Sequence, residues 1–260
     1  MKYLAYARSE FIRGFRYGAN YWATISGSLV LVLVQWYLWH AVYRNYDALA
    51  GVSLNEMISY AMMARVISGF LGEPANIRIG ERVRSGDIAH DLVKPVDLYL
   101  QILFQTLGRA SFNLVTSGLP LFAVLYAVGV LRLPGPAVLL AFVVSVATGY
   151  LTLFCTSFAS GILTFHTKSE VGLGHVYTVL ELFSGLYFPL DFFPGWVGAV
   201  ARFLPFGAIH YTPLAIWSGL FEPGEVVWSL CVQLAWALFM TVLSRALWWS
   251  AVRSLTIHGG

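Results

Sequence analysis

The segment from Trp22 to Tyr43 reads WATISGSLVLVLVQWYLWHAVY and contains no Asp, Glu, Lys or Arg. A helix of about 20 predominantly apolar residues is long enough to cross the hydrocarbon core of a bilayer. The segment therefore predicts a membrane-spanning helix, with Gln35 as an intramembrane polar residue within it.

The composition of the whole chain agrees with this interpretation. Its 260 residues are 58% hydrophobic and 11% charged, and the mean hydropathy is +0.70. Soluble domains have about 45–50% apolar and about 25% charged residues, so this chain has too few polar side chains to cover a water-exposed surface. The composition predicts an integral membrane protein. The net charge of +3 is too small to indicate a nucleic-acid partner.

Five further apolar stretches are long enough to cross a membrane. Together with 22–43, the predicted spans are 54–72, 98–130, 137–165, 171–190 and 226–249. The third span in chain order, 98–130, is long enough to be tilted or broken. The sequence thus predicts an all-α integral membrane fold with six transmembrane helices in a single domain, 1–260. Cys155 and Cys231 lie in apolar runs and are expected to be small hydrophobic residues rather than a disulfide.

Residues 1–20 are basic and aromatic, but they lack the continuous apolar core and cleavage site of a signal peptide. As a helix, this segment places Leu4, Ala7, Phe11 and Phe15 on one face and its Lys and Arg residues on the remainder. Such a helix lies along a membrane surface and contacts anionic lipid. We therefore expect an interfacial helix before the first span.

The Lys and Arg residues predict the orientation. With a cytoplasmic N-terminus, eleven of the sixteen fall in cytoplasmic segments, three in outer segments and two within spans. Cytoplasmic loops carry an excess of Lys and Arg, so both termini and the loop 76–97 are predicted to be cytoplasmic.

The outer segment 191–225 is too apolar for a free loop and too rich in proline for a single span. Helices are interrupted at five nearby prolines, namely Pro189, Pro194, Pro205, Pro213 and Pro223. Short helices are expected between the second and third of these and after the fourth. Such a segment is tolerated at membrane depth when it is buried in protein or lies at the interface, so we expect an outer re-entrant helical hairpin.

The chain lacks the sequence signals of several kinds of catalytic site. It has no G-x-x-x-x-G-K-[ST] phosphate loop and no metal-ligand spacing of His, Cys, Asp and Glu. A rhomboid-like serine protease needs a G-x-S-x motif and a His from another span. Ser184 lacks the preceding glycine, and His210 is expected outside the spans, so no Ser–His pair is predicted.

Four polar residues fall within predicted spans: Gln35, Arg65, Arg109 and Glu181. Ionisable groups inside a membrane are costly and often functional. Glu181 could pair with either arginine. The residues could line a transport path, form structural ion pairs, or lie nearer a helix end than the predicted boundaries indicate.

The loop between the second and third spans, NIRIGERVRSGDIAHDLVKPVDLY (76–99), holds eight charged side chains. Within it, SGDIAHDLV predicts one short helix that Ser85 or Asp87 would cap and that stops before Pro95. Ile88 and Leu92 would form an apolar tip inside a collar of both charge signs. Such an element favours docking of a soluble protein. The candidate docking residues are Ser85, Gly86, Asp87, Ile88, His90, Asp91, Leu92 and Lys94.

Two stretches resemble the permease subunits of type-2 ABC exporters. IRIGERVRSGDIAHDLVKPVD resembles the pattern I-x-x-G-x-I-x-x-x-L-x-K-P-V that follows the second span in one efflux subgroup, through Gly86, Ile88, Leu92, Lys94, Pro95 and Val96. FSGLYFPLDFFPGWVGAVARFLPFGAIHYTPLAIWSG resembles the second signature of that subgroup, through Ser184, Gly185, Pro189, Phe193, Pro194, Leu204, Pro205, Phe206, Pro213 and Gly219. The resemblance covers essentially the whole chain.

The resemblance implies a transport subunit of a bacterial inner membrane. It implies that the loop helix is a coupling helix that docks in a cleft of a partner ATPase subunit, and that a second permease, identical or different, completes the path. The chain would be no enzyme and hold no cofactor, because ATP and Mg²⁺ would bind the ATPase subunits. A secondary carrier or channel and a structural assembly subunit remain the alternatives.

Overall fold

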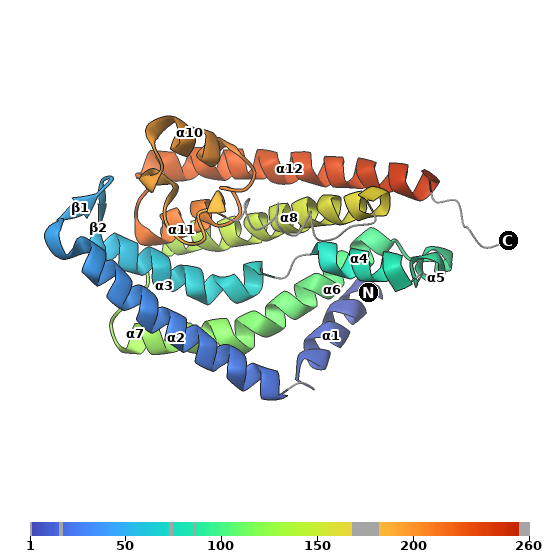
Figure 1. Cartoon of the computed structure of the whole chain (residues 1–260), viewed down its shortest axis with the longest axis horizontal. Coiled ribbons are helices and arrows are strands. Elements are labelled where there is room, and N and C mark those ends of the chain that lie inside the picture. The colour runs from blue at the N-terminus through green and yellow to red at the C-terminus, as the bar shows by residue number, and fades with distance from the viewer. Residues whose placement is uncertain (1, 16–17, 73–74, 86, 168–181, 255–260) are drawn as a thin grey trace.

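The computed structural model describes residues 2–15, 18–72, 75–85, 87–167 and 182–254, and these residues are mostly helical (Figure 1). The long helices are α2 (Gly18–Val42), α3 (Leu54–Leu71), α6 (Leu98–Asn113), α8 (Pro136–Thr167) and α12 (Pro223–Ser254). The shorter ones are α1 (Lys2–Gly14), α4 (Ala75–Ser85), α5 (Asp87–Val93), α7 (Leu119–Ala127), α10 (Gly195–Phe203) and α11 (Tyr211–Ser218). The remaining elements are η1 (Tyr43–Asn45), β1 (Ala48–Leu49), β2 (Val52–Ser53), the π-helical η2 (Leu114–Gly118) and η3 (Leu190–Phe192).

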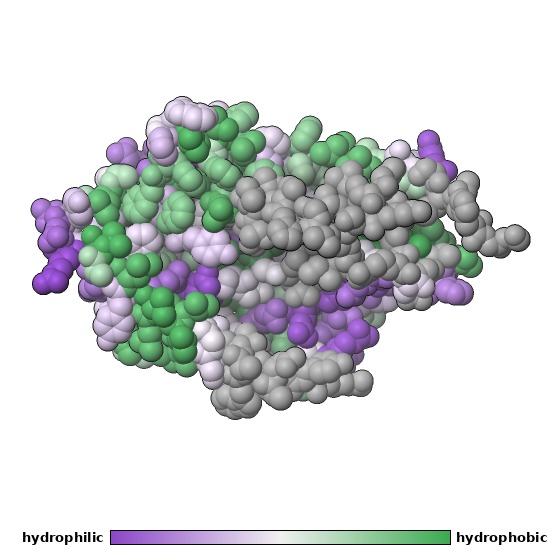
Figure 2. All heavy atoms as spheres, in the orientation of Figure 1, coloured by the Kyte–Doolittle hydropathy of each residue, from purple (hydrophilic) through white to green (hydrophobic). Residues whose placement is uncertain are grey.

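Three helical segments of the described chain are long and apolar enough to cross a membrane. They are Leu98–Ala127, Pro136–Ile162 and Pro223–Arg253. Large hydrophobic side chains on α2 and α12 are exposed, and Figure 2 shows apolar surface over both helices, with hydrophilic residues at the β1–β2 tip and near α4. Soluble proteins rarely expose apolar surface on this scale. The chain is therefore a membrane protein with apolar helices.

The helix α3 lies at the centre of the described fold and packs against α2, η2, α7 and α11. Its first turn is fixed by a capping box: the Ser53 hydroxyl accepts from the Glu56 N–H, and the Glu56 carboxylate accepts from the Ser53 N–H. The short β1–β2 hairpin precedes it and pairs Ala48 with Ser53. Ten of the eighteen side chains of α3 are buried, so this helix contributes mainly to the protein core.

The predicted third span contains an irregularity: α6 and α7 are joined by the π-helical turn η2. The predicted fifth span, 171–190, falls mostly on residues 168–181, which lie outside the described residues. The described remainder leaves the helix after Leu182 and forms turns up to Pro189. Gly185 adopts φ +80°, and a Cβ there would lie 2.6 Å from the Tyr211 Cβ. Only glycine fits this position, because the chain turns here and passes close to α11.

The elements gather at two ends of the molecule (Figure 1). We call the end formed by α4, α5, the start of α6 and the last turns of α12 the α5 end. We call the opposite end, formed by β1–β2, α10 and α11, the hairpin end. Each has its own hydrophobic cluster. Ile79, Tyr99 and Phe158 belong to the cluster of the α5 end, and Tyr60 and Leu214 belong to the cluster that extends to the hairpin end.

Candidate functional site

The predicted docking helix exists as α5, but its apolar surface differs from the expected one. Ile88 is only 7% exposed and packs in the cluster of the α5 end. Leu92 is 39% exposed and Val93 is 86% exposed. The expectation that Ile88 and Leu92 project together is wrong, because α5 lies against the protein and directs its first apolar residue inward. The exposed apolar tip consists of Leu92 and Val93.

A groove lies beside this tip. It has a volume of about 410 Å³ and lies between the α5–α6 junction, including Leu92 and Val96, and the end of α12, including Trp248, Trp249 and Arg253. The contribution of α12 to this groove was not predicted from the sequence. The sequence does contain a signal for a surface position of these residues, since aromatic and basic residues gathered at the end of a span are typical of the membrane interface.

The carboxylate of Asp91 ties α5 to the helices around it. It is buried, with oxygens 2.8 Å from Arg82 Nη1 and 2.7 Å from Lys94 Nζ. Arg82, on α4, also donates to Gln105 Oε1 of α6 at 2.8 Å. Asp91 was expected in an exposed collar, but it is buried between two cations, because α4 packs against α5 and α6 and brings Arg82 to it. The hydrogen bond to Asp91 and its negative charge raise the pKa of the exposed Lys94 ammonium.

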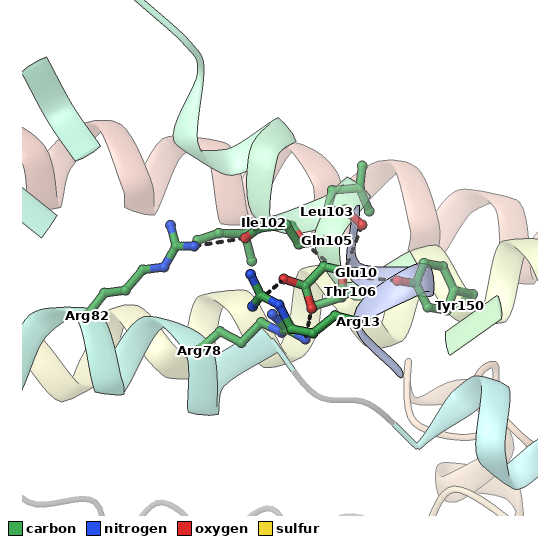
Figure 3. Close-up of polar contacts among 9 residues, drawn as sticks. All are labelled: Glu10, Arg13, Arg78, Arg82, Ile102, Leu103, Gln105, Thr106 and Tyr150. Atoms are coloured by element: carbon green, nitrogen blue, oxygen red, sulfur yellow. Dashed lines mark hydrogen bonds and ion pairs between the residues drawn. The ribbon is translucent and has the colours of Figure 1, made fainter. Parts of the chain in front are cut away.

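A second ion-pair cluster joins α1 to α4 (Figure 3). The buried Glu10 accepts from Arg13 Nη1 at 3.0 Å and from Arg78 Nη2 at 3.4 Å. The helix α1 lies along α6, and a Cβ at Gly108 would overlap the carbonyl oxygen of Ala7. Helix α1 is thus clamped to the remainder of the protein by an ion pair and by close backbone contact.

The start of α6 is held to α12. Asp97 accepts from the Leu100 N–H at 3.1 Å, which caps α6, and it forms an ion pair with Arg245 of α12. The Arg245 guanidinium also lies over the Tyr99 ring, 4.1 Å from its centroid. In turn, the Tyr99 hydroxyl hydrogen-bonds Ser244. Residues from α1, α4, α5, α6 and α12 are therefore linked by polar contacts at the α5 end.

The other candidate docking residues lie around α5. Ser85 ends α4, is exposed, and donates to the Arg82 carbonyl oxygen at 3.4 Å. His90 is exposed. Asp87 is the first residue of α5, and Gly86 lies outside the described residues.

The four predicted intramembrane polar residues do not form one cluster in the described part of the chain. Gln35 Oε1 and Arg65 Nε are buried and lack a hydrogen-bond partner there. Arg109 lies 5.4 Å from the Phe112 ring centroid, with its guanidinium over the ring. Glu181 lies outside the described residues, so its pairing with either arginine stays a prediction.

One pair that was not expected does form: His210 Nδ1 lies 3.1 Å from Ser184 Oγ. The expectation that His210 would not meet Ser184 is wrong, because the hairpin folds back and brings α11 onto the described end of the predicted fifth span. Both residues are buried. The Tyr211 N–H also donates to the Ser184 carbonyl at 2.8 Å. These contacts fasten α11 in place.

Apolar helices that cross a membrane, together with a polar cluster and an apolar tip at one end, define a multi-pass helical membrane protein. The sequence model of the ABC-2 family transporter proteins matches residues 29–259, and the chain belongs to this family. Its members are membrane components of transporters. No curated protein and no solved structure matches the chain.

Proposed function

We propose that the chain is the permease subunit of an ATP-driven exporter. It would form the substrate path with a second permease, identical or different, and would be driven by separate ATPase subunits that bind ATP and Mg²⁺. The chain itself would have no nucleotide site. It would reside in a bacterial inner membrane with both termini and the α5 end on the cytoplasmic side.

Six spans are part of this proposal. They correspond to α2, α3, the continuous α6–η2–α7 segment, α8, the segment 171–190 and α12. The exposed apolar surface of α2 supports a position in lipid or against a second permease. The exposed Leu4 and Phe15 support contact of the α1 region with the membrane interface, beside its clamp to α6.

The observation that carries the proposal is the exposed tip of α5 in a chain of the ABC-2 transporter family. Leu92 and Val93 lie beside a groove that Trp248 and Trp249 line. An exposed apolar patch with a polar rim is typical of a protein interaction surface. We therefore assign the tip and the groove to contact with the ATPase.

The ion pairs supply a route for the motion. A displacement of α5 would be passed to α4 and α6 through Asp91, Arg82 and Gln105, and to α1 through Arg78 and Glu10. Helices linked in this way would move together when ATP closes the ATPase subunits. The export step requires no covalent chemistry by the permease.

The test replaces the tip with charge. Leu92→Asp and Val93→Asp should insert and fold normally, but each should release the ATPase, because a carboxylate buried in an apolar cleft costs several kcal/mol. The matched control is Val200→Asp, since Val200 is also exposed but lies on α10, at the hairpin end. Co-purification of the ATPase and stimulated ATP hydrolysis are measured for each.

The proposal fails if both tip variants retain the ATPase and normal hydrolysis, or if the control loses them equally. Transport that continues without ATP would favour a secondary carrier or channel. Transport that continues when the chain is deleted would favour a structural assembly subunit.

A further inference from the structure

A partly open cavity of about 380 Å³ lies between α3, η2, α7, α8 and α11. Every described residue that lines it is apolar, among them Met63, Phe70, Leu114, Val146 and Trp217. Ligand pockets span about 300–1,000 Å³ and are lined mainly by apolar side chains. An apolar lining gives water no hydrogen bonds, so a cavity of this kind takes up apolar molecules. This cavity is therefore suited to hydrocarbon.

The π-helical turn η2 forms part of its wall. Gly118, at the end of this turn, lies so close to α3 that a Cβ would be 2.5 Å from the Val66 carbonyl oxygen. Asn113 Nδ2 donates to the Gly69 carbonyl at 3.3 Å and fixes the same contact. The backbone of η2 is thus held against α3, while the side chains of Leu114 and Val66 border the cavity. Single π-helical turns occur frequently at functional sites.

A second, polar cavity adjoins the first. It has a volume of about 510 Å³, lies toward the hairpin end, and shares Leu133 and Trp217 with the apolar cavity. Its polar lining includes His40 of α2, Ser59 of α3 and Arg132 of the loop between α7 and α8. Among the described residues that line it, Arg132 is the only one with a permanent charge, and none is acidic. This cavity therefore favours an anionic group.

The two cavities together match an amphipathic anion. The apolar cavity is bordered by Leu119, Leu133 and Val143, all exposed on the apolar surface of a membrane protein, so it is open to the hydrocarbon phase. A molecule that enters from the bilayer would place its tail here and its charged group beside Arg132 and His40. We propose that the two cavities form one binding site for an anionic phospholipid, with an acyl chain in the apolar cavity and the phosphate beside Arg132.

The test measures lipid binding to the purified full chain in detergent by native mass spectrometry. The probes are phosphatidylglycerol and a diacylglycerol with the same acyl chains, which lacks the phosphate. Val146→Phe fills the apolar cavity, and Val144→Phe is its matched control, because Val144 is exposed on the same helix outside the cavity lining. Arg132→Gln removes the positive charge, and its control is Arg44→Gln, at another exposed arginine near the hairpin end.

Val146→Phe should weaken binding of both lipids by at least about tenfold, because the acyl chain loses its apolar site. Arg132→Gln should weaken phosphatidylglycerol about fivefold, the typical value of one arginine near an anionic lipid, and should leave diacylglycerol unchanged. The melting temperature of each variant verifies folding. Retained phosphatidylglycerol binding in Val146→Phe, or equal losses in Arg132→Gln and Arg44→Gln, would overturn the proposal and indicate unspecific adhesion of lipid. The experiment involves neither ATP nor transport, so its outcome is independent of the proposed function.

Discussion

The two ends of the molecule differ in the balance of their interactions, although the hairpin end also has one ion pair among its described residues, between Arg202 and Asp191. At the α5 end, ion pairs between side chains join neighbouring helices, as between Asp91 and Arg82 or Glu10 and Arg78. At the hairpin end, several buried bonds reach the backbone. There the Tyr60 hydroxyl donates to the Gly185 carbonyl, and the Tyr211 N–H donates to the Ser184 carbonyl.

This difference indicates which end can move. Long charged side chains can keep an ion pair while the helices beneath them shift, because their rotatable stems follow. A bond to a buried carbonyl fixes the backbone itself, and breaking it leaves a polar group unsatisfied. The α5 end is therefore suited to receive motion from a partner, and the hairpin end is suited to stay rigid.

The largest effect is expected from Ile88→Asp. Ile88 is buried in the cluster of the α5 end, so the carboxylate would lie in an apolar environment. We expect a loss of more than about 3 kcal/mol in the free energy of unfolding. Leu92→Asp, on the same helix but exposed, should change this free energy little. SDS titration of each variant in mixed micelles measures the difference, and equal stabilities would show that Ile88 is not packed in the core.

A smaller effect is expected from Asp91→Asn, which removes the carboxylate that pairs with Arg82 and Lys94 but keeps the Arg82–Gln105 hydrogen bond. Because the pair is only partly shielded from solvent, we expect a loss of about 2 kcal/mol, below the cost of breaking a fully buried pair. The double variant with Arg82→Gln should lose less than the sum of the two single variants. Additive losses would mean that the two residues do not interact in the folded protein.

The smallest of the three effects is expected at the hairpin end, from Tyr60→Phe. The change removes the hydroxyl that donates a hydrogen bond to the Gly185 carbonyl. We expect the free energy of unfolding to fall by about 1–2 kcal/mol. The control is Tyr37→Phe, because Tyr37 is exposed on α2. Salt sharpens the comparison: raising it should reduce the effect of Asp91→Asn but leave that of Tyr60→Phe unchanged. An equal response to salt would remove the distinction between the two ends.

Much of the class of this protein could be predicted from the chain alone. The scarcity of charge and the uncharged run from Trp22 to Tyr43 predict membrane helices, because hydrocarbon excludes unpaired charge regardless of how the helices pack. The motifs around Lys94–Pro95 and Ser184–Gly185 predict the family, and the family model confirms it. These features are local, so no knowledge of distant contacts is needed to recognise them.

The directions of individual side chains could not be predicted in this way. On a helix as short as α5, Ile88 and Leu92 share a face, and only the position of α4 and α6 decides which of them is covered. The burial of Asp91 likewise depends on the packing of α4, which places Arg82 beside its carboxylate. Hydrophobic periodicity predicts that one face of a helix is apolar, but it does not predict which element packs against that face.

The sequence by itself determined that this is a helical membrane protein of a transporter family, because transfer of apolar helices into a bilayer depends on the composition of each segment. Only the tertiary structure decided that His210 meets Ser184, that Trp248 and Trp249 border the α5 groove, and that an apolar and a polar cavity both border Leu133 and Trp217. The reason is physical. Each of these features joins segments far apart in the chain, and their meeting is set by the packing of whole helices against one another.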